Sequence, residues 1–369
     1  MAKIAIDARL INSSTGRYIE RLIHYLEDVD TENDYIIIIP SKDKNFYTPF
    51  NPRFTVVFSD HQIYSFSEQI GFKNLLDSLG ADLVHFCMPQ QPILYKGKSV
   101  TTIHDLTLLN TYNSDKNWVI FHAKQLVGRY VFKRVARKSR HVITPTEYVK
   151  KSVVAFAGIP ESKVTVTYEA AEKIPGTPKA YEPVIEKEFL LYVGSQSDYK
   201  NIKRLILAHQ KLLQNNPDLQ LVLVGKTTGR NGAAAARNKA WSQTKHHKNV
   251  VFTGFLPDEQ LAWLYQHTAA YVFPSLMEGF GLPGLEAMIS GAPVISSNTT
   301  CLPEVHGDAA EYFNPNDVDD MAAAIWRVIS NETRRNELIQ KGYAQADKYS
   351  WRRMAEQTHA LYMNALNDK

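Results

Sequence analysis

Short runs of apolar and β-branched residues alternate with longer amphipathic segments along most of the chain. In the first half, such runs predict strands at residues 3–7, 35–39, 55–58, 83–86, 100–103, 141–144 and 164–167. In the second half, they predict strands at residues 189–193, 219–224, 250–253, 270–273, 294–296 and 311–313. Many of these runs are apolar on both faces, as expected for parallel sheets covered by helices on each side. The alternation therefore predicts an α/β protein with two doubly wound sheets.

The composition changes at residues 173–187, which contain three prolines, one glycine and no apolar periodicity. This segment predicts a linker between an N-terminal Rossmann-like domain at residues 1–172 and a C-terminal Rossmann-like domain at residues 188–350. Residues 351–369 predict an amphipathic helix, which either closes the second domain or crosses back to the first. We expect the two domains to face each other across a cleft at the carboxyl ends of their strands, where open α/β sheets bind ligands.

Length, charge and cysteine content exclude several classes of protein. The 369 residues suggest two domains, and 44% hydrophobic with 22% charged residues is typical of soluble proteins. No apolar run reaches the roughly 20 residues of a membrane span, and no signal-peptide core follows Met1-Ala2-Lys3. Two cysteines, Cys87 and Cys301, cannot build a disulfide framework, so we expect a cytoplasmic protein. A net charge of +4 is too small to indicate nucleic-acid binding.

The segment 274–298 combines a predicted strand end, a glycine-bearing loop and a helix that starts near Pro283. Gly279, Gly281 and Gly284 would let backbone amides approach a ligand, and the helix N-terminus favours an anion. These glycines also spell G-x-G-x-x-G, the dinucleotide fingerprint. Leu276, Met277 and Glu278 intervene between the strand and these glycines, however, and the next predicted strand ends in Ser-Ser-Asn without an acidic residue. The pattern therefore favours a phosphate site over an NAD site.

Two carboxylates, Glu278 and Glu286, bracket this loop at a spacing of eight residues. We expect Glu286 in the first turn of the helix, where one interpretation is a surface glutamate that complements the helix dipole. The other interpretation is a carboxylate that accepts hydrogen bonds from vicinal hydroxyls, such as those of a ribose. Glu278 would then face the other end of the ligand.

The Glu278-x7-Glu286 pair resembles that of the retaining family-4 glycosyltransferases of GT-B fold, including mannosyl- and rhamnosyltransferases. The resemblance continues at residues 253–255, 303–305 and 349–351, and in the N-terminal half at residues 16–18, 104–106 and 141–144. It implies an α/β GT-B architecture, in which two Rossmann-like domains face an interdomain cleft. The domain at residues 1–172 would bind the acceptor, and the domain at residues 188–350 would bind a nucleotide sugar.

The resemblance also implies roles for individual residues of the C-terminal half. Glu286 would hold the ribose hydroxyls, whereas Glu278 and the loop from Gly279 through Phe280 and Gly281 to Leu282 would hold the sugar and the phosphate. Lys200 matches the lysine that neutralises the leaving diphosphate, and a fixed cation is what that growing charge requires. Phe255, beside Gly254, would lie near the base.

The sequence departs from the family where an arginine commonly accompanies this lysine. Ser195 and Tyr199 occupy the two positions at which that arginine is found, so the second cation must come from elsewhere. Our candidate is Lys226, which follows a predicted strand and Gly225, with Arg230 behind it.

In the N-terminal half, His104 matches a family histidine that touches the donor sugar, and Asp105 would orient it or the acceptor. Gly16 opens a helix after a polar loop and offers backbone amides to an anion, although a plain connecting loop is an equal interpretation. In retaining enzymes of this fold the leaving diphosphate is thought to accept the proton of the acceptor. Neither glutamate is therefore assigned as a nucleophile.

Residues 116–151 carry ten lysines and arginines against a single acid, Glu147. One interpretation is a helix, ending near Ser139, with a solvated basic face. The other is a surface that docks on anionic lipid. This helix would carry an apolar stripe, made of Val119, Ile120, Val127, Tyr130, Val131 and Val135. Nucleic acid is disfavoured because no aromatic stacking platform accompanies the charge.

No metal site is expected. Asp317-Val318-Asp319 has the spacing of a metal-binding D-x-D motif, but helix capping explains it. His246-His247 has no carboxylate or cysteine at ligand spacing.

These observations predict a metal-independent retaining glycosyltransferase without a cofactor. Mannose from GDP-mannose is the first choice of donor, and a dTDP- or UDP-sugar is the second. The acceptor would be a glycan or a polyprenyl-phosphate-linked molecule, reached from the cytoplasm at the inner face of the membrane. The alternatives are a catalytically silent nucleotide-sugar sensor or scaffold, a nucleotide-sugar epimerase of GT-B fold and, last, an NAD dehydrogenase.

Overall fold

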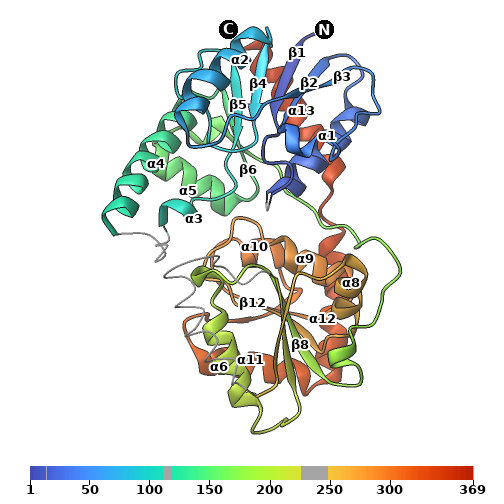
Figure 1. The fold of residues 1–369 in the computed structure, drawn as a ribbon. Helices are drawn as coiled ribbons and strands as arrows, with labels where there is room; N and C mark the ends of the chain where they lie inside the picture. The colour runs from blue at the N-terminus through green and yellow to red at the C-terminus, as the bar shows by residue number, and fades with distance from the viewer. Residues whose placement is uncertain (14, 111–117, 226–247, 369) are drawn as a thin grey trace. The chain divides into compact units, whose positions relative to one another are not determined.

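The chain folds into two compact units, which Figure 1 shows in a computed structural model describing residues 1–13, 15–110, 118–225 and 248–368. Unit 1 comprises Met1–Asn110, Trp118–Glu169 and Ser350–Lys369, and unit 2 comprises Ala170–Tyr349. Residues 173–187, predicted as a linker, are grouped with unit 2 and contain a 3-10 helix at Glu182–Val184.

Unit 1 is built on a parallel sheet of seven strands in the order β3-β2-β1-β4-β5-β6-β7. Its strands are β1 (Lys3–Asp7), β2 (Asp34–Ile39), β3 (Phe54–Phe58), β4 (Leu83–Phe86), β5 (Ser99–Thr102), β6 (His141–Thr144) and β7 (Val164–Val166). Along β1, Ala5 lies beside Ile36 of β2 on one side and Val84 of β4 on the other. The central strands are buried on both faces, because helices cover each side of the sheet.

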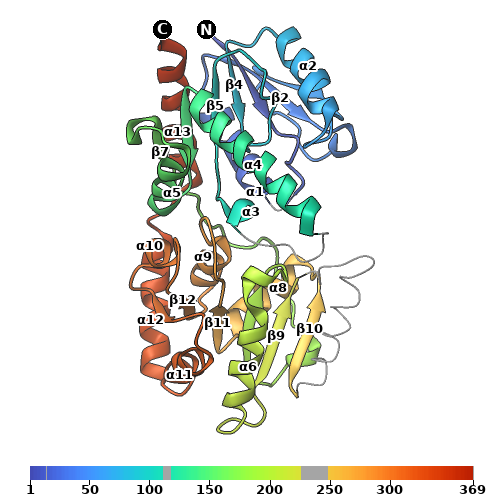
Figure 2. The ribbon, with the colours of Figure 1, turned by 90° about the vertical axis from the view of Figure 1, so that its left-hand side faces the viewer.

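The helices of unit 1 are α1 (Gly16–Val29), α2 (Lys73–Ser78), α3 (Thr107–Asn110), α4 (Trp118–Lys138), α5 (Glu147–Ala157) and α13 (Trp351–Asn367). A π-helix, η2 (Glu68–Phe72), leads into α2. The C-terminal helix α13 packs against α1 in this unit, and Figure 2 shows α4 crossing the opposite face of the sheet. The last helix of the chain therefore contributes to the core formed by the first half of the sequence.

Unit 2 contains a parallel sheet of six strands in the order β10-β9-β8-β11-β12-β13. Its strands are β8 (Phe189–Val193), β9 (Gln220–Val224), β10 (Val250–Gly254), β11 (Ala270–Phe273), β12 (Val294–Ser297) and β13 (Ala310–Phe313). Its helices are α6 (Ile202–Leu212), α8 (Asp258–His267), α9 (Leu282–Ile289), α10 (Leu302–His306), α11 (Val318–Ile329) and α12 (Glu332–Ala346). Helices α6 and α11 share a core on one face, whereas α9 packs against α12.

All thirteen predicted strands are present, with ends that differ by no more than one residue from the prediction. Each sheet has a switch point at which successive connections run in opposite directions, between β1 and β4 in unit 1 and between β8 and β11 in unit 2. The carboxyl ends of the strands beside a switch point form the usual ligand-binding crevice of an open α/β sheet. The loops after these strands are therefore where functional side chains are expected.

Candidate active site

Lys200 and Glu278 meet at the switch point of unit 2. Lys200 ends a short 3-10 turn, η5 (Asp198–Lys200), in the loop after β8, and Glu278 lies in the loop after the neighbouring strand β11. The Lys200 ammonium donates a hydrogen bond to Glu278 Oε1 at 2.6 Å. Their side chains are only 13% and 12% exposed, so the ion pair is largely withdrawn from solvent. Two residues that sequence analysis selected separately thus form one site.

Asn201 joins the two loops that carry this pair. Its backbone adopts a left-handed conformation, with φ of 60°, at the entry of α6. Its buried amide group donates to the carbonyl oxygens of Pro274, at 3.0 Å, and Pro315, at 2.7 Å. A second connection is the Leu276 N–H, which donates to the Tyr199 carbonyl at 2.8 Å. Sequence analysis missed Asn201, although asparagine tolerates this conformation better than most residues.

Thr300 is a second residue that sequence analysis missed. Its φ is 58°, a strained conformation for a β-branched residue. The Thr300 hydroxyl accepts a hydrogen bond from the Glu278 N–H at 3.3 Å and donates one to the Thr299 carbonyl at 2.8 Å. A threonine in the sequence does not signal a left-handed backbone. Only the structure therefore reveals that a strained residue holds the Glu278 loop.

The glycines of this loop serve close packing. Gly281 has φ of 101°, and a Cβ there would lie 2.8 Å from Leu302 Cδ2. A Cβ at Gly284 would lie 2.2 Å from His306 Nε2, and the Gly284 N–H already donates to the Gly281 carbonyl at 3.0 Å. The expectation that Gly284 admits a ligand is therefore wrong, because it makes room for His306. Burial lowers the pKa of His306 to about 4, so this histidine is neutral at physiological pH.

The remaining loop residues are also held by unit 2. Gly279 is buried, and Phe280 places its ring edge-on to Tyr349 with centroids 5.7 Å apart. The Phe280 carbonyl accepts a hydrogen bond from Cys301 Sγ at 3.3 Å. Leu282 is half-buried at the first position of α9. The loop is thus preorganised by its surroundings.

Glu286 lies inside unit 2. It is the fifth residue of α9 and so occupies the second turn, which corrects the expectation of a first-turn position. It is 6% exposed, and its Oε2 accepts a hydrogen bond from the Tyr265 hydroxyl at 3.4 Å. The interpretation as a surface glutamate is therefore wrong. A buried carboxylate requires hydrogen-bond donors, and the hydroxyls of a bound ribose could supply them. The assignment of Glu286 to ribose hydroxyls stays a prediction.

The other donor-site candidates of unit 2 have different surroundings. The Ser195 hydroxyl lies 3.2 Å from the Ser197 hydroxyl, and Phe255 is 78% exposed immediately after β10. Lys226, with Arg230, lies outside the described residues. Gly225, just before Lys226, could not carry a side chain, because a Cβ would lie 2.0 Å from the Gly194 carbonyl oxygen.

In unit 1, His104 follows β5 and is held from three sides. Its Nδ1 lies 3.2 Å from Glu169 Oε1, and its Nε2 lies 3.1 Å from the Cys87 carbonyl oxygen. The Tyr18 ring stands edge-on to the imidazole with centroids 4.7 Å apart. Sequence analysis missed Glu169, which is 65 residues away along the chain.

Asp105 and Gly16 have local contacts. The Asp105 carboxylate accepts a hydrogen bond from the Thr107 N–H at 2.7 Å and so caps the start of α3. The carboxylate beside His104 is that of Glu169. The Gly16 N–H donates to the Ser13 carbonyl at 3.0 Å, and a Cβ at Gly16 would lie 1.8 Å from the Ile11 carbonyl oxygen. Gly16 thus allows a tight entry into α1, and its amide is already used.

Two family models together match most of the chain. Residues 15–171 match the model of Glycosyltransferase Family 4, and residues 177–345 match the model of Glycosyl transferases group 1. The O-antigen chain mannosyltransferase B of Escherichia coli is 30% identical over 280 residues, which are 72% of this chain and 70% of that protein. The chain belongs to the glycosyltransferases.

The serotype-specific mannosyltransferase WbdA of Escherichia coli is 34% identical over 265 residues. The matched residues are 69% of this glycosyltransferase but only 32% of WbdA. Among solved structures, a sucrose-phosphate synthase from Thermosynechococcus elongatus is 18% identical, with a TM-score of 0.77 and 99% of both chains covered. The predicted fold class, GT-B with two Rossmann-like parallel-sheet domains, is confirmed.

The basic helix α4 of this glycosyltransferase exposes apolar side chains. Leu126, Val127 and Tyr130 are 69%, 63% and 58% exposed, whereas Phe132 and Val135 are buried. The predicted apolar stripe is therefore buried at Val135 but exposed at Val127 and Tyr130. Exposed basic residues lie on the same helix, namely Arg129, Lys133, Arg134 and Arg137. Among the predicted stripe residues, the side chains of Val119 and Ile120 lie outside the described part of the chain.

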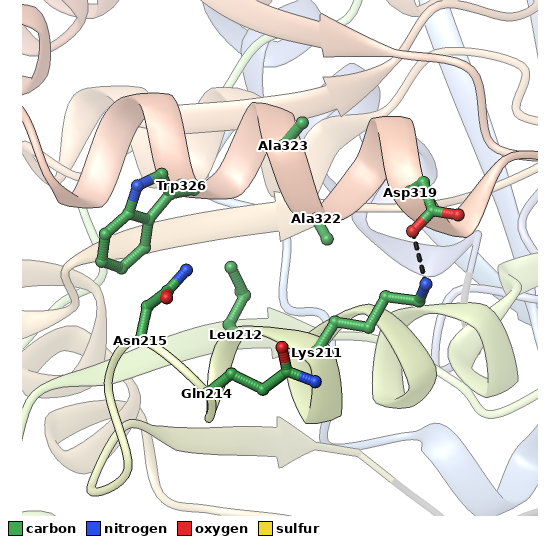
Figure 3. Close-up of a pocket in the computed structure, with 8 residues that line it drawn as sticks. All are labelled: Lys211, Leu212, Gln214, Asn215, Asp319, Ala322, Ala323 and Trp326. Carbon is green, nitrogen blue, oxygen red and sulfur yellow. Dashed lines mark hydrogen bonds and ion pairs between the residues drawn. The ribbon is translucent and has the colours of Figure 1, made fainter.

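A shallow pocket of about 330 Å³ lies elsewhere in unit 2, between α6 and α11. Figure 3 shows its lining, with Lys211 paired to Asp319 at one end and Trp326 at the other. None of the candidate site residues lines it.

Within the described ranges, no group of three or more His, Cys, Asp or Glu side chains is placed to hold a metal ion. Asp317 caps α11, as predicted, by accepting hydrogen bonds from the N–H groups of Asp319 and Asp320. His246 and His247 lie outside the described residues. No helix in the described part of the chain is long and apolar enough to span a bilayer.

Proposed function

We propose that this glycosyltransferase transfers mannose from GDP-mannose, with retention of anomeric configuration, to a glycan or a polyprenyl-phosphate-linked acceptor in polysaccharide or glycolipid synthesis. The observation that carries the proposal is the Lys200–Glu278 pair at the switch point of unit 2, with Glu286 buried on the next helix. The choice of mannose is supported by the two Escherichia coli relatives, both of which are mannosyltransferases.

Cleavage of the sugar–phosphate bond develops negative charge on the diphosphate oxygen, and in this proposal Lys200 supplies a cation that stabilises it. Before the donor binds, Glu278 holds the Lys200 ammonium in place. When a diphosphate arrives, the ammonium turns to the phosphate and frees Glu278 to accept hydrogen bonds from the sugar hydroxyls. A fixed lysine can supply the charge that a metal ion provides in other transferases, which supports metal independence.

Without a covalent glycosyl-enzyme intermediate, retention requires that the acceptor hydroxyl attack from the side on which the diphosphate leaves. In this proposal the departing diphosphate oxygen takes the acceptor proton, and the new bond forms as the old one breaks. Glu278 acts as a hydrogen-bond acceptor for the sugar hydroxyls and not as a nucleophile, because the acceptor hydroxyl itself attacks the sugar carbon. His104, held by Glu169 and the Cys87 carbonyl, would contact the donor sugar, as the family resemblance implies.

The deciding experiment is a calorimetric titration of GDP, UDP, ADP and dTDP into the wild type and Glu286→Ala. We expect GDP to bind the wild type best, and the variant to bind at least tenfold more weakly, since one or two hydrogen bonds to a carboxylate are lost. Tyr265→Phe is the matched control, because it removes the internal partner of Glu286 but keeps the carboxylate. Unchanged affinity in Glu286→Ala would contradict the ribose assignment.

Turnover distinguishes the proposed enzyme from a silent sensor. With GDP-mannose and a mannan fragment, release of GDP should track the mannose transferred, and NMR of the product should show the donor's α configuration. The release should persist in EDTA. Tight binding of a nucleotide sugar without release of GDP would favour the sensor, and conversion of the donor sugar without an acceptor would favour an epimerase.

We further propose that α4 docks on an anionic membrane, which would bring the site to a lipid-linked acceptor. Exposed Leu126 and Tyr130 can enter the interface while Lys133 and Arg134 meet lipid phosphates. Each basic residue contributes about 1 kcal/mol at such a surface, so Lys133→Gln with Arg134→Gln should weaken liposome binding about 30-fold.

Lys42→Gln with Lys44→Gln is the matched control, because it removes two exposed charges from unit 1 but none from α4. Equal loss of binding in both double variants would show a general charge effect. No binding by the wild type to phosphatidylglycerol vesicles would leave α4 as a solvated basic helix.

A further inference from the structure

A chain of buried polar side chains runs through unit 1 from the C-terminal helix toward His104. The Tyr362 hydroxyl of α13 lies 2.5 Å from His85 Nδ1, and His85 Nε2 lies 2.8 Å from Thr102 Oγ1. Thr102 Oγ1 in turn lies 2.9 Å from the Tyr18 hydroxyl. All four residues are at most 3% exposed. The chain thus links β4, β5, α1 and α13 inside one compact unit.

The last member of this chain contacts His104. The Tyr18 ring stands edge-on to the imidazole at 80°, with centroids 4.7 Å apart. Because the hydroxyl at the far end of the Tyr18 ring is bonded to Thr102, the ring cannot slide along the imidazole without breaking that bond. Glu169 and the Cys87 carbonyl fix the two nitrogens of His104, and Tyr18 fixes the plane of its ring.

His85 makes its two hydrogen bonds run in the same direction along the chain of polar side chains. Burial, with a smaller effect from His104, lowers the pKa of His85 to about 3, so its imidazole is neutral. A neutral imidazole has one N–H donor and one acceptor nitrogen. Its hydrogen bonds to Tyr362 and Thr102 must therefore run in the same sense along the chain. Either Tyr362 donates to Nδ1 while Nε2–H donates to Thr102, or both bonds are reversed.

We propose that Tyr18, Thr102, His85 and Tyr362 are positioning residues for His104, and that this chain is what the C-terminal helix contributes to catalysis. The proposal rests on the proposed function, because it assumes that His104 contacts the donor sugar. Four polar groups buried together cost desolvation energy that apolar side chains of similar shape would avoid. Satisfied networks of this kind confer a single geometry on the groups they support.

The first test uses Tyr18→Phe and Tyr362→Phe, which remove only hydroxyls. We expect kcat to fall about tenfold in each, while the affinity for GDP stays within twofold, because the nucleotide is held in unit 2. Tyr35→Phe is the matched control. It also removes a fully buried hydroxyl from unit 1, one that donates to Asp30 at 2.7 Å, outside this chain. The control should lower the melting temperature but leave kcat within twofold.

The second test does not depend on turnover. In ¹⁵N-histidine NMR of the whole protein, the His104 resonances can be assigned by their loss in His104→Ala. Tyr18→Phe and Tyr362→Phe should both shift these resonances, and Tyr35→Phe should not. A shift caused by Tyr362→Phe is the more telling result, because the hydrogen bonds of Tyr362 lead toward His104 through His85 and Thr102.

The two tests separate the ways in which the inference can fail. If the wild type shows no transfer but Tyr362→Phe moves the His104 resonances, the chain positions His104 and the proposed function is wrong. If the wild type transfers mannose and Tyr362→Phe changes neither kcat nor the resonances, the chain is a packing feature and the inference is overturned. Equal losses of kcat in Tyr362→Phe and Tyr35→Phe would likewise overturn it.

Discussion

The Lys200–Glu278 pair allows structure and chemistry to be separated by a double-mutant cycle. The perturbations are Lys200→Met, Glu278→Gln and their combination, which keep side-chain volume but remove one or both charges. At 2.6 Å and an effective dielectric constant of about 20, the gross attraction is about 6 kcal/mol. Withdrawing two ions from water costs several kcal/mol each, so the net contribution of the pair to stability is small.

Removing one partner has a larger effect than removing both. Each single variant leaves a charge that is almost nine-tenths buried without its partner, which should lower the free energy of unfolding by about 2–4 kcal/mol. The double variant should return to within about 1 kcal/mol of the wild type, because no unpaired charge remains. Urea unfolding followed by circular dichroism measures both quantities.

Transfer rates should follow a different pattern. If Lys200 stabilises the leaving diphosphate, the activation free energy should rise by about 2–4 kcal/mol in Lys200→Met, so that turnover falls roughly 30- to 1,000-fold. The double variant should lose at least as much turnover, because it also lacks the carboxylate proposed to hold the sugar. Recovery of turnover together with stability in the double variant would refute the catalytic assignment. Additive losses of stability would refute the coupling.

The surface pair Lys211–Asp319, seen in Figure 3, is the matched control for the stability measurement. Its side chains are 50% and 78% exposed. Lys211→Met should therefore cost at most about 1 kcal/mol and leave turnover unchanged.

Three further predictions concern the surroundings of the sites. Thr300→Gly should be more stable to urea than Thr300→Ala by about 1 kcal/mol, because both lack the hydroxyl but only alanine is strained at φ of 58°; equal stability would show that the backbone relaxes. Gly284→Ala should lower the free energy of unfolding by about 1–3 kcal/mol, since its Cβ would meet His306 Nε2 at 2.2 Å, and His306→Ala should restore part of the loss. Buried His85 and His306 have pKa values lowered to about 3 and 4, so the stability they contribute is present above about pH 6.5 and is lost as the pH falls toward those values; a flat urea midpoint between pH 7 and pH 4.5 would contradict their burial as neutral groups.

The sequence was sufficient to predict the strands and the residues of the glycine loop. Strands such as Phe189–Val193 are apolar on both faces, and a short run of this kind between turn signals has few alternatives to a buried parallel strand. Glu278 and Glu286 could be selected because they lie in the loop after a strand and in the helix that follows it, where parallel sheets bind ligands. Lys200 was selected because it matches the lysine of the family that the sequence resembles.

Surroundings that depend on distant residues could not be predicted in this way. The sequence left open whether Glu286 is a surface residue or a ligand-binding one, whereas the structure buries its carboxylate beside Tyr265 of α8. It likewise showed an apolar stripe that includes Val127 and Tyr130, but only the structure shows that both are exposed. Helical periodicity shows that a face exists, but only the packed neighbours decide whether that face is covered.

The sequence by itself determined where strands form, which loops follow them and which charged residues those loops carry, because these properties depend on patterns of a few neighbouring residues. The tertiary structure alone decided which side chains meet. It pairs Lys200 with Glu278 across 78 residues, His104 with Glu169 across 65, and His85 with Tyr362 across 277. Such contacts arise from the order of strands in a sheet and from the return of α13 to unit 1, which no local pattern encodes.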